Sequence, residues 1–230
     1  MIPFFRRATE AIALAIVSVG AVGAVSHSAQ AQDYPVIRNV EERPSPWVVN
    51  GCTIAPNASC EGADLRHADL KDANLQGANL KGARLARADL RHANLQGADL
   101  TEANLDGARL EIAFMQGAKL SRATLRGADL SFARMARADF SEADLTAATL
   151  ESAWAKGVRF NGAKFINTDL QETKFYEADL SNAVFDGVKI RFAIFQDAFM
   201  EGCTGCPHDW QTGGKVWEQD KTKWEPASGQ

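Results

Sequence analysis

The sequence has no apolar run of about 20 residues, the length that a membrane-spanning helix needs. Its main apolar stretch, Ala11–Val25, has only fifteen residues and follows a basic start at Arg6 and Arg7. Residues 29–31, Ala-Gln-Ala, have the small-x-small pattern at which export signals are cleaved. We therefore expect residues 1–31 to be a signal peptide and the mature chain to be periplasmic or secreted. The alternative is an uncleaved anchor.

The chain also lacks a strong charge of either sign. Its formal net charge is -4 at pH 7, and the expected signal carries a net +1 from Arg6, Arg7 and Glu10, so its removal leaves -5. Affinity for nucleic acid comes largely from Lys and Arg that contact phosphates. We expect no nucleic-acid partner, and no membrane association once the signal is cleaved.

Cysteine is scarce, and all four cysteines lie outside the signal: Cys52, Cys60, Cys203 and Cys206. Four cysteines allow three disulfide pairings. An exported location favours their oxidation.

A period of five residues dominates the rest of the chain. Ala63 to Gly202 form twenty-eight consecutive pentapeptides without an insertion, and the central residue of each is apolar, mostly Leu, Phe or Met. The residue two positions earlier is nearly always Ala. Two apolar positions separated by one polar residue suit a very short strand with one buried face. The other two residues must turn the chain, and Gly at the last position of many units favours a tight corner.

Sides of five residues that always turn the same way close on themselves, and four sides make a coil of twenty. The array therefore predicts seven coils in which residues twenty apart stack, such as Phe140 on Phe160, and similarly Phe165 on Phe185 and Phe175 on Phe195. An α-helical array is excluded, because a period of five drifts around a helix of 3.6 residues per turn and gives no apolar face.

The pattern Ala-(Asp/Asn)-Leu-x-x resembles that of the pentapeptide-repeat proteins, over 140 of 230 residues. The resemblance implies an all-β fold, a right-handed quadrilateral parallel β-helix with the large apolar and small residues pointing inward. We expect residues 63–202 to form this solenoid, residues 32–62 an N-terminal segment and cap, and residues 203–230 a C-terminal cap or tail.

Some members of this family resemble DNA and inhibit topoisomerases, but they are strongly acidic and cytoplasmic. Residues 63–202 carry 18 basic and 20 acidic side chains. That role is not expected here.

The fold limits the disulfide pairing. Seven coils spaced by about 4.8 Å place the two ends of the array roughly 30 Å apart, whereas bridged Cα atoms lie within about 7 Å. We expect Cys52 to pair with Cys60 and Cys203 with Cys206, as pins of the two caps. The alternative for Cys203 and Cys206 is a redox-active C-x-x-C pair, or a zinc site with His208 that lacks an evident fourth ligand.

Catalysis has little support in the sequence. His67 and His92 fall at different corners, no Ser, His and Asp share a column, and a leucine-filled rod offers no obvious pocket. We expect no enzyme and no cofactor or metal. Trp210, Trp217 and Trp224 in the tail are interpreted as rings that close the end of the core rather than as a ligand site.

One corner departs from the polar exterior. Coils one and two carry Asp72, Asn74, His92 and Asn94 there, but later coils carry large apolar residues at positions expected to point outward: Ile112, Phe114, Phe132, Trp154, Phe192 and Ile194. Such a run is typical of an interaction surface. We expect a non-enzymatic scaffold that binds a protein partner or a second copy as a homodimer. The alternative is that the tail or residues 33–50 cover this corner.

Overall fold

The computed structural model describes residues 44–207. Its strands are short: β1 (Val48–Val49), β2 (Cys52–Thr53), β3 (Lys164–Ile166) and β4 (Val184–Asp186). The remaining β-structure consists of single-residue bridges, because only one or two residues of each five-residue side are extended. Within the described residues, no helix is long and apolar enough to cross a membrane.

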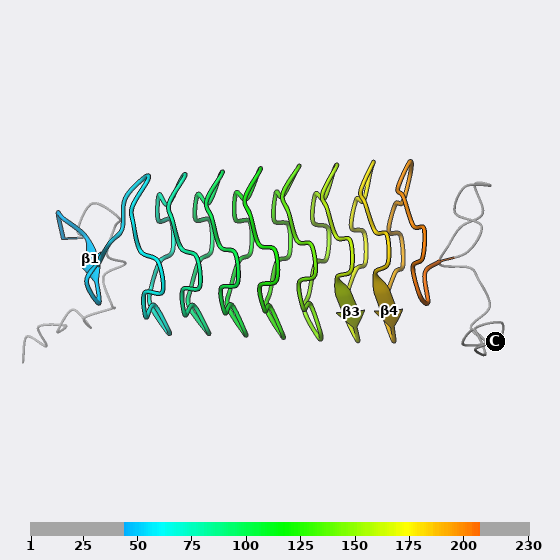
Figure 1. Cartoon of the computed structure of the whole chain (residues 1–230), viewed down its shortest axis with the longest axis horizontal. Helices are drawn as coiled ribbons and strands as arrows, with labels where there is room; N and C mark the ends of the chain where they lie inside the picture. The colour runs from blue at the N-terminus through cyan, green and yellow to red at the C-terminus, as the bar shows by residue number, and fades with distance from the viewer. Residues whose placement is uncertain (1–43, 208–230) are drawn as a thin grey trace, which may run out of the picture. The chain divides into compact units, whose positions relative to one another are not determined.

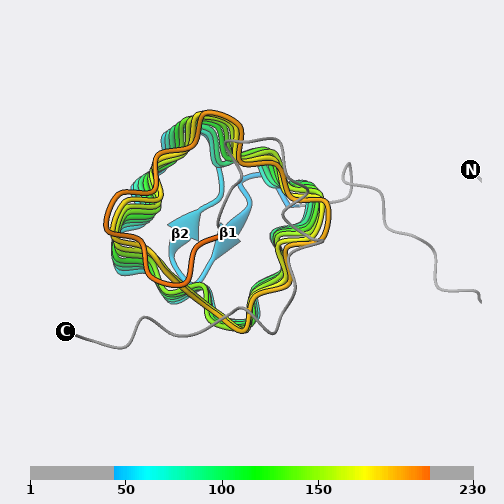
Figure 2. The same ribbon diagram turned by 90° about the vertical axis from the view of Figure 1, so that its right-hand side faces the viewer.

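The chain winds into stacked coils of twenty residues. Every isolated bridge is parallel and joins residues twenty apart, from Ser59 with Asn79 to Val184 with Thr204, and β3 pairs with β4 in the same register. Figure 1 shows the coils stacked side by side, and the view along the stack shows their four-sided outline (Figure 2). The fold is the predicted right-handed quadrilateral parallel β-helix, and the period of twenty is confirmed.

The same backbone hydrogen bonds recur along the stack. The N–H of Leu85 donates to the carbonyl of Asn104 in the next coil at 2.7 Å, and the N–H of Arg84 donates to the carbonyl of Ala63 in the previous coil at 2.9 Å. The N–H of Ala88 closes the corner by donating to the carbonyl of Leu85 at 3.0 Å. These bonds hold each side chain directly above and below its counterparts twenty residues away.

The core holds the large central residues and the small residues two positions before them, as predicted. Central side chains such as Leu85 and Phe160 have no exposed surface. Phe160 lies at the centre of a ring cluster, with centroid distances of 5.2 Å to Phe140, 5.2 Å to Phe165 and 5.8 Å to Phe175. The expected stacks of Phe165 on Phe185 and of Phe175 on Phe195 are also present, at 4.8 and 5.0 Å.

Two of the small positions hold threonine instead of alanine, and both hydroxyls are satisfied. Thr168 Oγ1 donates to the carbonyl of Leu145 at 2.8 Å, and Thr173 Oγ1 donates to that of Leu150 at 2.7 Å. A buried hydroxyl without a partner would cost free energy. Threonine is therefore tolerated here because the preceding coil supplies an acceptor.

The corners have the positive φ that glycine at the last position predicts. The last residue of all twenty-eight pentapeptides has positive φ, and eighteen of these residues are not glycine. The hydrogen bonds between coils fix this conformation whatever the side chain. Non-glycine residues pay a steric penalty in this region, so tertiary pairing overrides local preference.

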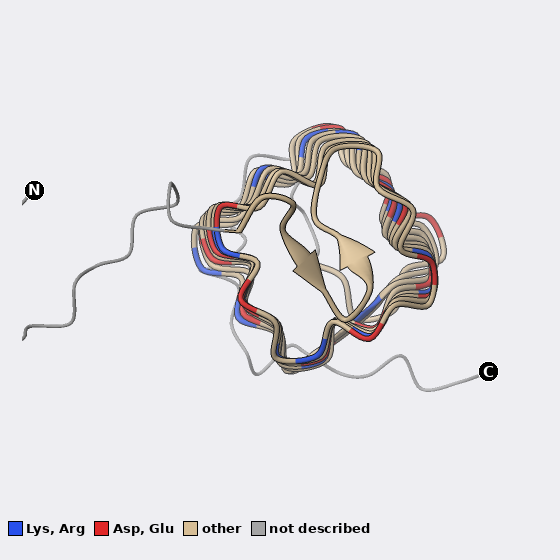
Figure 3. Ribbon diagram, turned by 90° about the vertical axis from the view of Figure 1, so that its left-hand side faces the viewer, with Lys and Arg blue, Asp and Glu red and all other residues tan. Residues whose placement is uncertain are grey.

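A disulfide-pinned hairpin lies across the N-terminal end of the stack. β1 pairs antiparallel with β2, and Cys52 is bonded to Cys60 with a Cα–Cα distance of 5.3 Å. Figure 3 shows this hairpin in front of the first coil. Cys60 occupies the central, buried position of a first, irregular side, which confirms the predicted pairing.

At the other end, Cys203 is bonded to Cys206, with Cα atoms 5.9 Å apart, so the second predicted pairing is also confirmed. Thr204 still pairs with Val184 in the last coil. The predicted role of Trp210, Trp217 and Trp224 lies outside the described residues.

Outward charges of both signs are interspersed around the coils (Figure 3). On the fourth side, the guanidinium of Arg159 lies 2.6 Å from the carboxylate of Asp139. Burial would raise the pKa of Asp139, but hydrogen bonds from Arg159 and Ser141 outweigh it and lower the pKa below its ordinary value. On the first side, the hydrogen bond from Arg66 lowers the pKa of Asp64 to about 2. These contacts pair opposite charges both between coils and within one coil.

Replacing Phe160, the central residue of the ring cluster, by smaller residues tests how much the cluster contributes to stability. Phe160→Ala is expected to lower the free energy of unfolding by about 3–5 kcal/mol, because it leaves a cavity between three other rings. Phe160→Leu is expected to cost less than about 1.5 kcal/mol, since leucine fills the same column at Leu80, Leu100, Leu120 and Leu180. Urea unfolding followed by circular dichroism measures both. Equal losses in the two variants would contradict this account.

Candidate functional site

The outward residues of the third side form a surface that we call the platform. It comprises three columns, each with one residue from each of coils three to seven. The first column holds residues 112, 132, 152, 172 and 192. The second column begins at residue 114 and the third at residue 116, and both continue in steps of twenty. All six residues of the predicted apolar corner belong to the first two columns. Phe132, Trp154, Phe192 and Ile112 are exposed by 56, 43, 43 and 39%, whereas Phe114 and Ile194 are half-buried.

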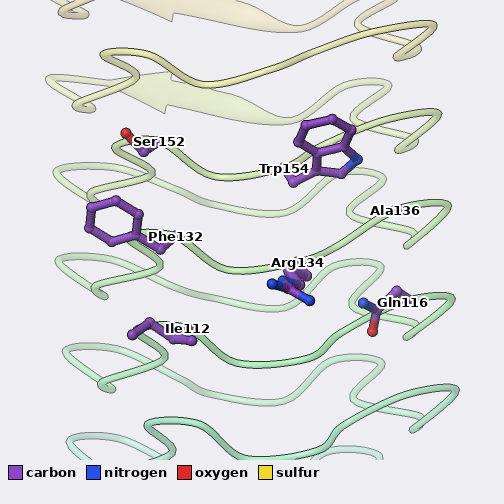
Figure 4. Close-up of a pocket in the computed structure, with 7 residues that line it drawn as sticks. All are labelled: Ile112, Gln116, Phe132, Arg134, Ala136, Ser152 and Trp154. Atoms are coloured by element: carbon purple, nitrogen blue, oxygen red, sulfur yellow. The ribbon is translucent and has the colours of Figure 1, made fainter.

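A shallow depression of about 560 Å³ lies in the middle of the platform. Its residues are Ile112, Gln116, Phe132, Arg134, Ala136, Ser152 and Trp154 (Figure 4). Ala136 stands where the neighbouring coils have Gln116 and Lys156, and Ser152 stands next to Phe132 in its column. These two small residues leave the hollow between larger neighbours.

Cations lie over the aromatic rings of the platform. The guanidinium carbon of Arg134 is 5.4 Å from the ring centroid of Phe114, and Nζ of Lys174 is 5.1 Å from that of Trp154. Trp154 also contacts Tyr176, with centroids 6.0 Å apart. The sequence analysis missed Arg134, Lys174 and Tyr176, although Arg134 and Lys174 lie twenty residues from the apolar residues of their column.

Coils three to seven of the platform lack a side-chain-to-backbone hydrogen bond that is common on the other sides. The residue before the central one is often Asp or Asn, whose side chain accepts a bond from the backbone N–H two residues later; Asn94 does so with Gln96 at 3.1 Å. In the third side this position changes after Asn94 to Phe, Arg, Trp, Lys and Ile in five consecutive coils. On each of the other three sides, Asp or Asn is never absent from this position in so many consecutive coils.

Three large apolar residues also occupy strained corner positions. Ile112, Phe132 and Phe192 have φ values of 61, 59 and 61°, in the left-handed region that costs an L-residue about 1–2 kcal/mol. Of the twenty-eight corner residues with positive φ, these are the only large apolar ones, and all three lie in one column of the platform. Residues that break local rules together are typical of a functional surface.

Other predicted sites gain no catalytic geometry. His67 and His92 are exposed at different corners. In the described part of the chain, no three His, Cys, Asp or Glu side chains gather as metal ligands would. Cys203 and Cys206 are bonded to each other, and His208 lies outside the described residues.

Residues 33–50 are one of the two expected covers of the platform, and the structure describes them from residue 44 onward. The last of these residues include β1, which pairs with β2 at the N-terminal end rather than with coils three to seven. Residues 33–43 and the tail from residue 208 lie outside the described residues. The described chain itself therefore leaves the platform open.

The coil geometry and the repeat define the class: a four-sided β-solenoid with a laterally exposed apolar surface. The family model for pentapeptide repeats matches residues 53–82, 83–122, 123–162, 143–182 and 163–202, with eight copies. The chain belongs to the pentapeptide-repeat family. No curated protein matches it.

Several solved pentapeptide-repeat proteins are similar to the chain. HetL of the cyanobacterium Nostoc sp. strain PCC 7120, involved in heterocyst differentiation regulation, is 29% identical over 65% of this chain and 84% of its own, with a TM-score of 0.33. Rfr23 of the cyanobacterium Cyanothece 51142 is 23% identical, and the match covers 56% of this chain and 89% of Rfr23, with a TM-score of 0.41. QnrB1, a plasmid-mediated fluoroquinolone resistance protein, is 21% identical, and the match covers 64% of this chain and 81% of QnrB1, with a TM-score of 0.33. With TM-scores this low, family membership depends on the repeat match.

Relieving the strain at a corner tests whether the platform costs stability. Phe132→Asn is expected to raise the free energy of unfolding by up to about 1 kcal/mol, because asparagine tolerates the left-handed region better. Ala147→Asn, at a positive-φ corner outside the platform, is the matched control and should gain similarly. Urea unfolding measures both. If Phe132→Asn alone destabilises the protein, Phe132 holds the fold together and the strain argument is wrong.

Proposed function

We propose that this protein is a non-enzymatic scaffold whose platform binds another protein. The observation that carries the proposal is the concentration of Ile112, Phe132 and Phe192 at strained, exposed corner positions of one column. Fold stability favours Asp, Asn or Gly at such positions. Their replacement by large apolar groups on one face has a physical reason if the groups bury surface against a partner.

The proposal includes an exported location. Residues 1–31 have the basic start, apolar stretch and small-x-small site of a signal peptide. The two disulfides agree with an oxidising compartment, because such bonds are rare where thiols are kept reduced. In this proposal the mature chain is periplasmic or secreted.

Two other functions are weaker. A thiol–disulfide redox role would use Cys203, which is partly exposed, and Cys206, which is buried; only the first of them has the partial exposure that reactive thiols need. A purely structural homo-oligomer would bury the platform against a second copy. The solution mass of the purified protein, measured by light scattering with and without Trp154→Arg, distinguishes that case, since a dimer through the platform would dissociate in the variant.

Site-specific photo-crosslinking in the producing cell tests the docking role. A benzophenone amino acid at position 132 of the platform is expected to crosslink a distinct protein. The same group at position 147, an exposed corner on another side, is the matched control and should not. Trp154→Arg should abolish the crosslink from position 132. Identical products from both positions, or none from position 132, would contradict a docking platform.

The export proposal predicts the mature N-terminus. Mass spectrometry of the protein recovered from the periplasm or medium is expected to show a chain that begins at Gln32. Replacing Ala29 and Ala31 by Arg should block cleavage, because the site requires small residues. Recovery of the intact chain from the cytoplasm alone would overturn the proposed location.

A further inference from the structure

The middle column of the platform alternates apolar and cationic side chains. Its residues are Phe114, Arg134, Trp154, Lys174 and Ile194, one from each coil, and each is bridged to the next. Coils lie about 4.8 Å apart, so the two cations are about 10 Å apart and the column is about 19 Å long. A partner that lies along this column meets apolar groups and positive charges in turn.

The two cations are not neutralised within the described part of the chain. No carboxylate oxygen among residues 44–207 lies within 4.0 Å of Arg134 or Lys174, and both side chains lie over aromatic rings instead. Lys156, in the adjacent column, is by contrast paired with Glu177 at 3.1 Å. Arg134 and Lys174 are therefore available to the carboxylates of a partner.

The charges at the rim restrict what that partner can be. Glu111, Glu151, Glu177 and Asp197 flank the three columns, and Glu172 lies within the first column, where it accepts a hydrogen bond from Ser152 at 3.0 Å. A broad polyanion such as a nucleic acid would therefore meet carboxylates on both sides. A second copy of the platform would add two more unpaired cations to the interface, and like charges at an interface oppose binding. The charge pattern instead fits a narrow segment with a few carboxylates between apolar side chains.

The spacing favours a helix over an extended segment. A side chain in every turn of an α-helix recurs after about 5.4 Å, so four intervals cover about 21 Å against the column's roughly 19 Å. Alternate residues of a strand recur after about 6.7 Å, so four intervals cover about 27 Å and lose register. The hollow at Ala136 and Ser152 (Figure 4) gives room for one large apolar side chain of the helix.

We propose that the platform binds an amphipathic α-helix of a partner protein, with apolar side chains at i, i+7 and i+14 and carboxylates at i+4 and i+11. The carboxylates pair with Arg134 and Lys174, and the apolar groups pack on Phe114, Trp154 and Ile194. This inference rests on the proposed docking function and adds the chemistry of the partner.

Two synthetic helical peptides test the inference with the purified protein. Both are fluorescently labelled 18-residue peptides with Leu at i, i+7 and i+14 and Ala or Gln elsewhere; one has Glu at i+4 and i+11, the other Lys. By fluorescence anisotropy at low salt, the Glu peptide is expected to bind about tenfold more tightly, since two attractive pairs replace two repulsive ones. The preference should shrink in 0.5 M NaCl.

Matched variants assign the effect to the two cations. The double variant Arg134→Gln/Lys174→Gln should remove the preference for Glu, whereas Lys164→Gln, an exposed cation of the same coil as Lys174 on the first side, should keep it. A third peptide has the composition of the Glu peptide but alternates apolar and polar residues, as a strand does. It should bind more weakly than the helical one.

The outcomes separate this inference from the docking function. If the Glu and Lys peptides bind equally and Phe132→Asn weakens both, the platform is a docking surface but the acidic helix is wrong. If the strand-like peptide binds best, the helix is wrong. If a peptide of residues 208–230, which has Trp at i, i+7 and i+14, displaces the Glu peptide at lower concentration than unlabelled Glu peptide does, the occupant is the chain's own tail. If no peptide binds, the inference is overturned. The docking function is then still tested by the crosslinking experiment.

Discussion

The parallel hydrogen bonds between residues twenty apart are the constraint on which the rest of this structure depends. Each coil supplies the donors and acceptors that its neighbours need, so neither its backbone nor its apolar face is satisfied alone. The bonds also fix the register, which stacks residues twenty apart into columns. Both the phenylalanine cluster around Phe160 and the alternation of ring and cation in the platform follow from this register.

The same register explains how the fold accommodates unsuitable residues. Once the hydrogen bonds force a positive φ at every corner, the residue there no longer decides the conformation and affects only its energy. Thr168 and Thr173 show the equivalent tolerance in the core, where the preceding coil provides an acceptor for each hydroxyl. Because the register fixes the corners, the scaffold can keep Ile112, Phe132 and Phe192 at strained positions, and this tolerance would allow the proposed binding surface to be built on a regular solenoid.

The platform combines charge with apolar area. On other sides many carboxylates and guanidinium groups of neighbouring positions pair, as Asp139 does with Arg159. In the platform, Arg134 and Lys174 are held over rings instead. A cation over a ring keeps its charge available to a carboxylate, because the ring does not neutralise it. Apolar area and unneutralised charge thus occur on the same surface, within reach of one partner.

The sequence by itself determined the coil, the buried positions, the two disulfides and the outward direction of the six apolar residues. All of these follow from a strict period of five, because alternation within each side and stacking after twenty residues are local and repetitive properties. Tertiary structure alone decided the rest. That Phe132 and Ile112 adopt a strained conformation depends on hydrogen bonds between coils, and the contacts of Arg134 with Phe114 and of Lys174 with Trp154 depend on the conformations that these side chains adopt within their column. The hollow at Ala136 and Ser152 has the same origin, since a small residue leaves a depression only when the larger neighbours around it are placed in space.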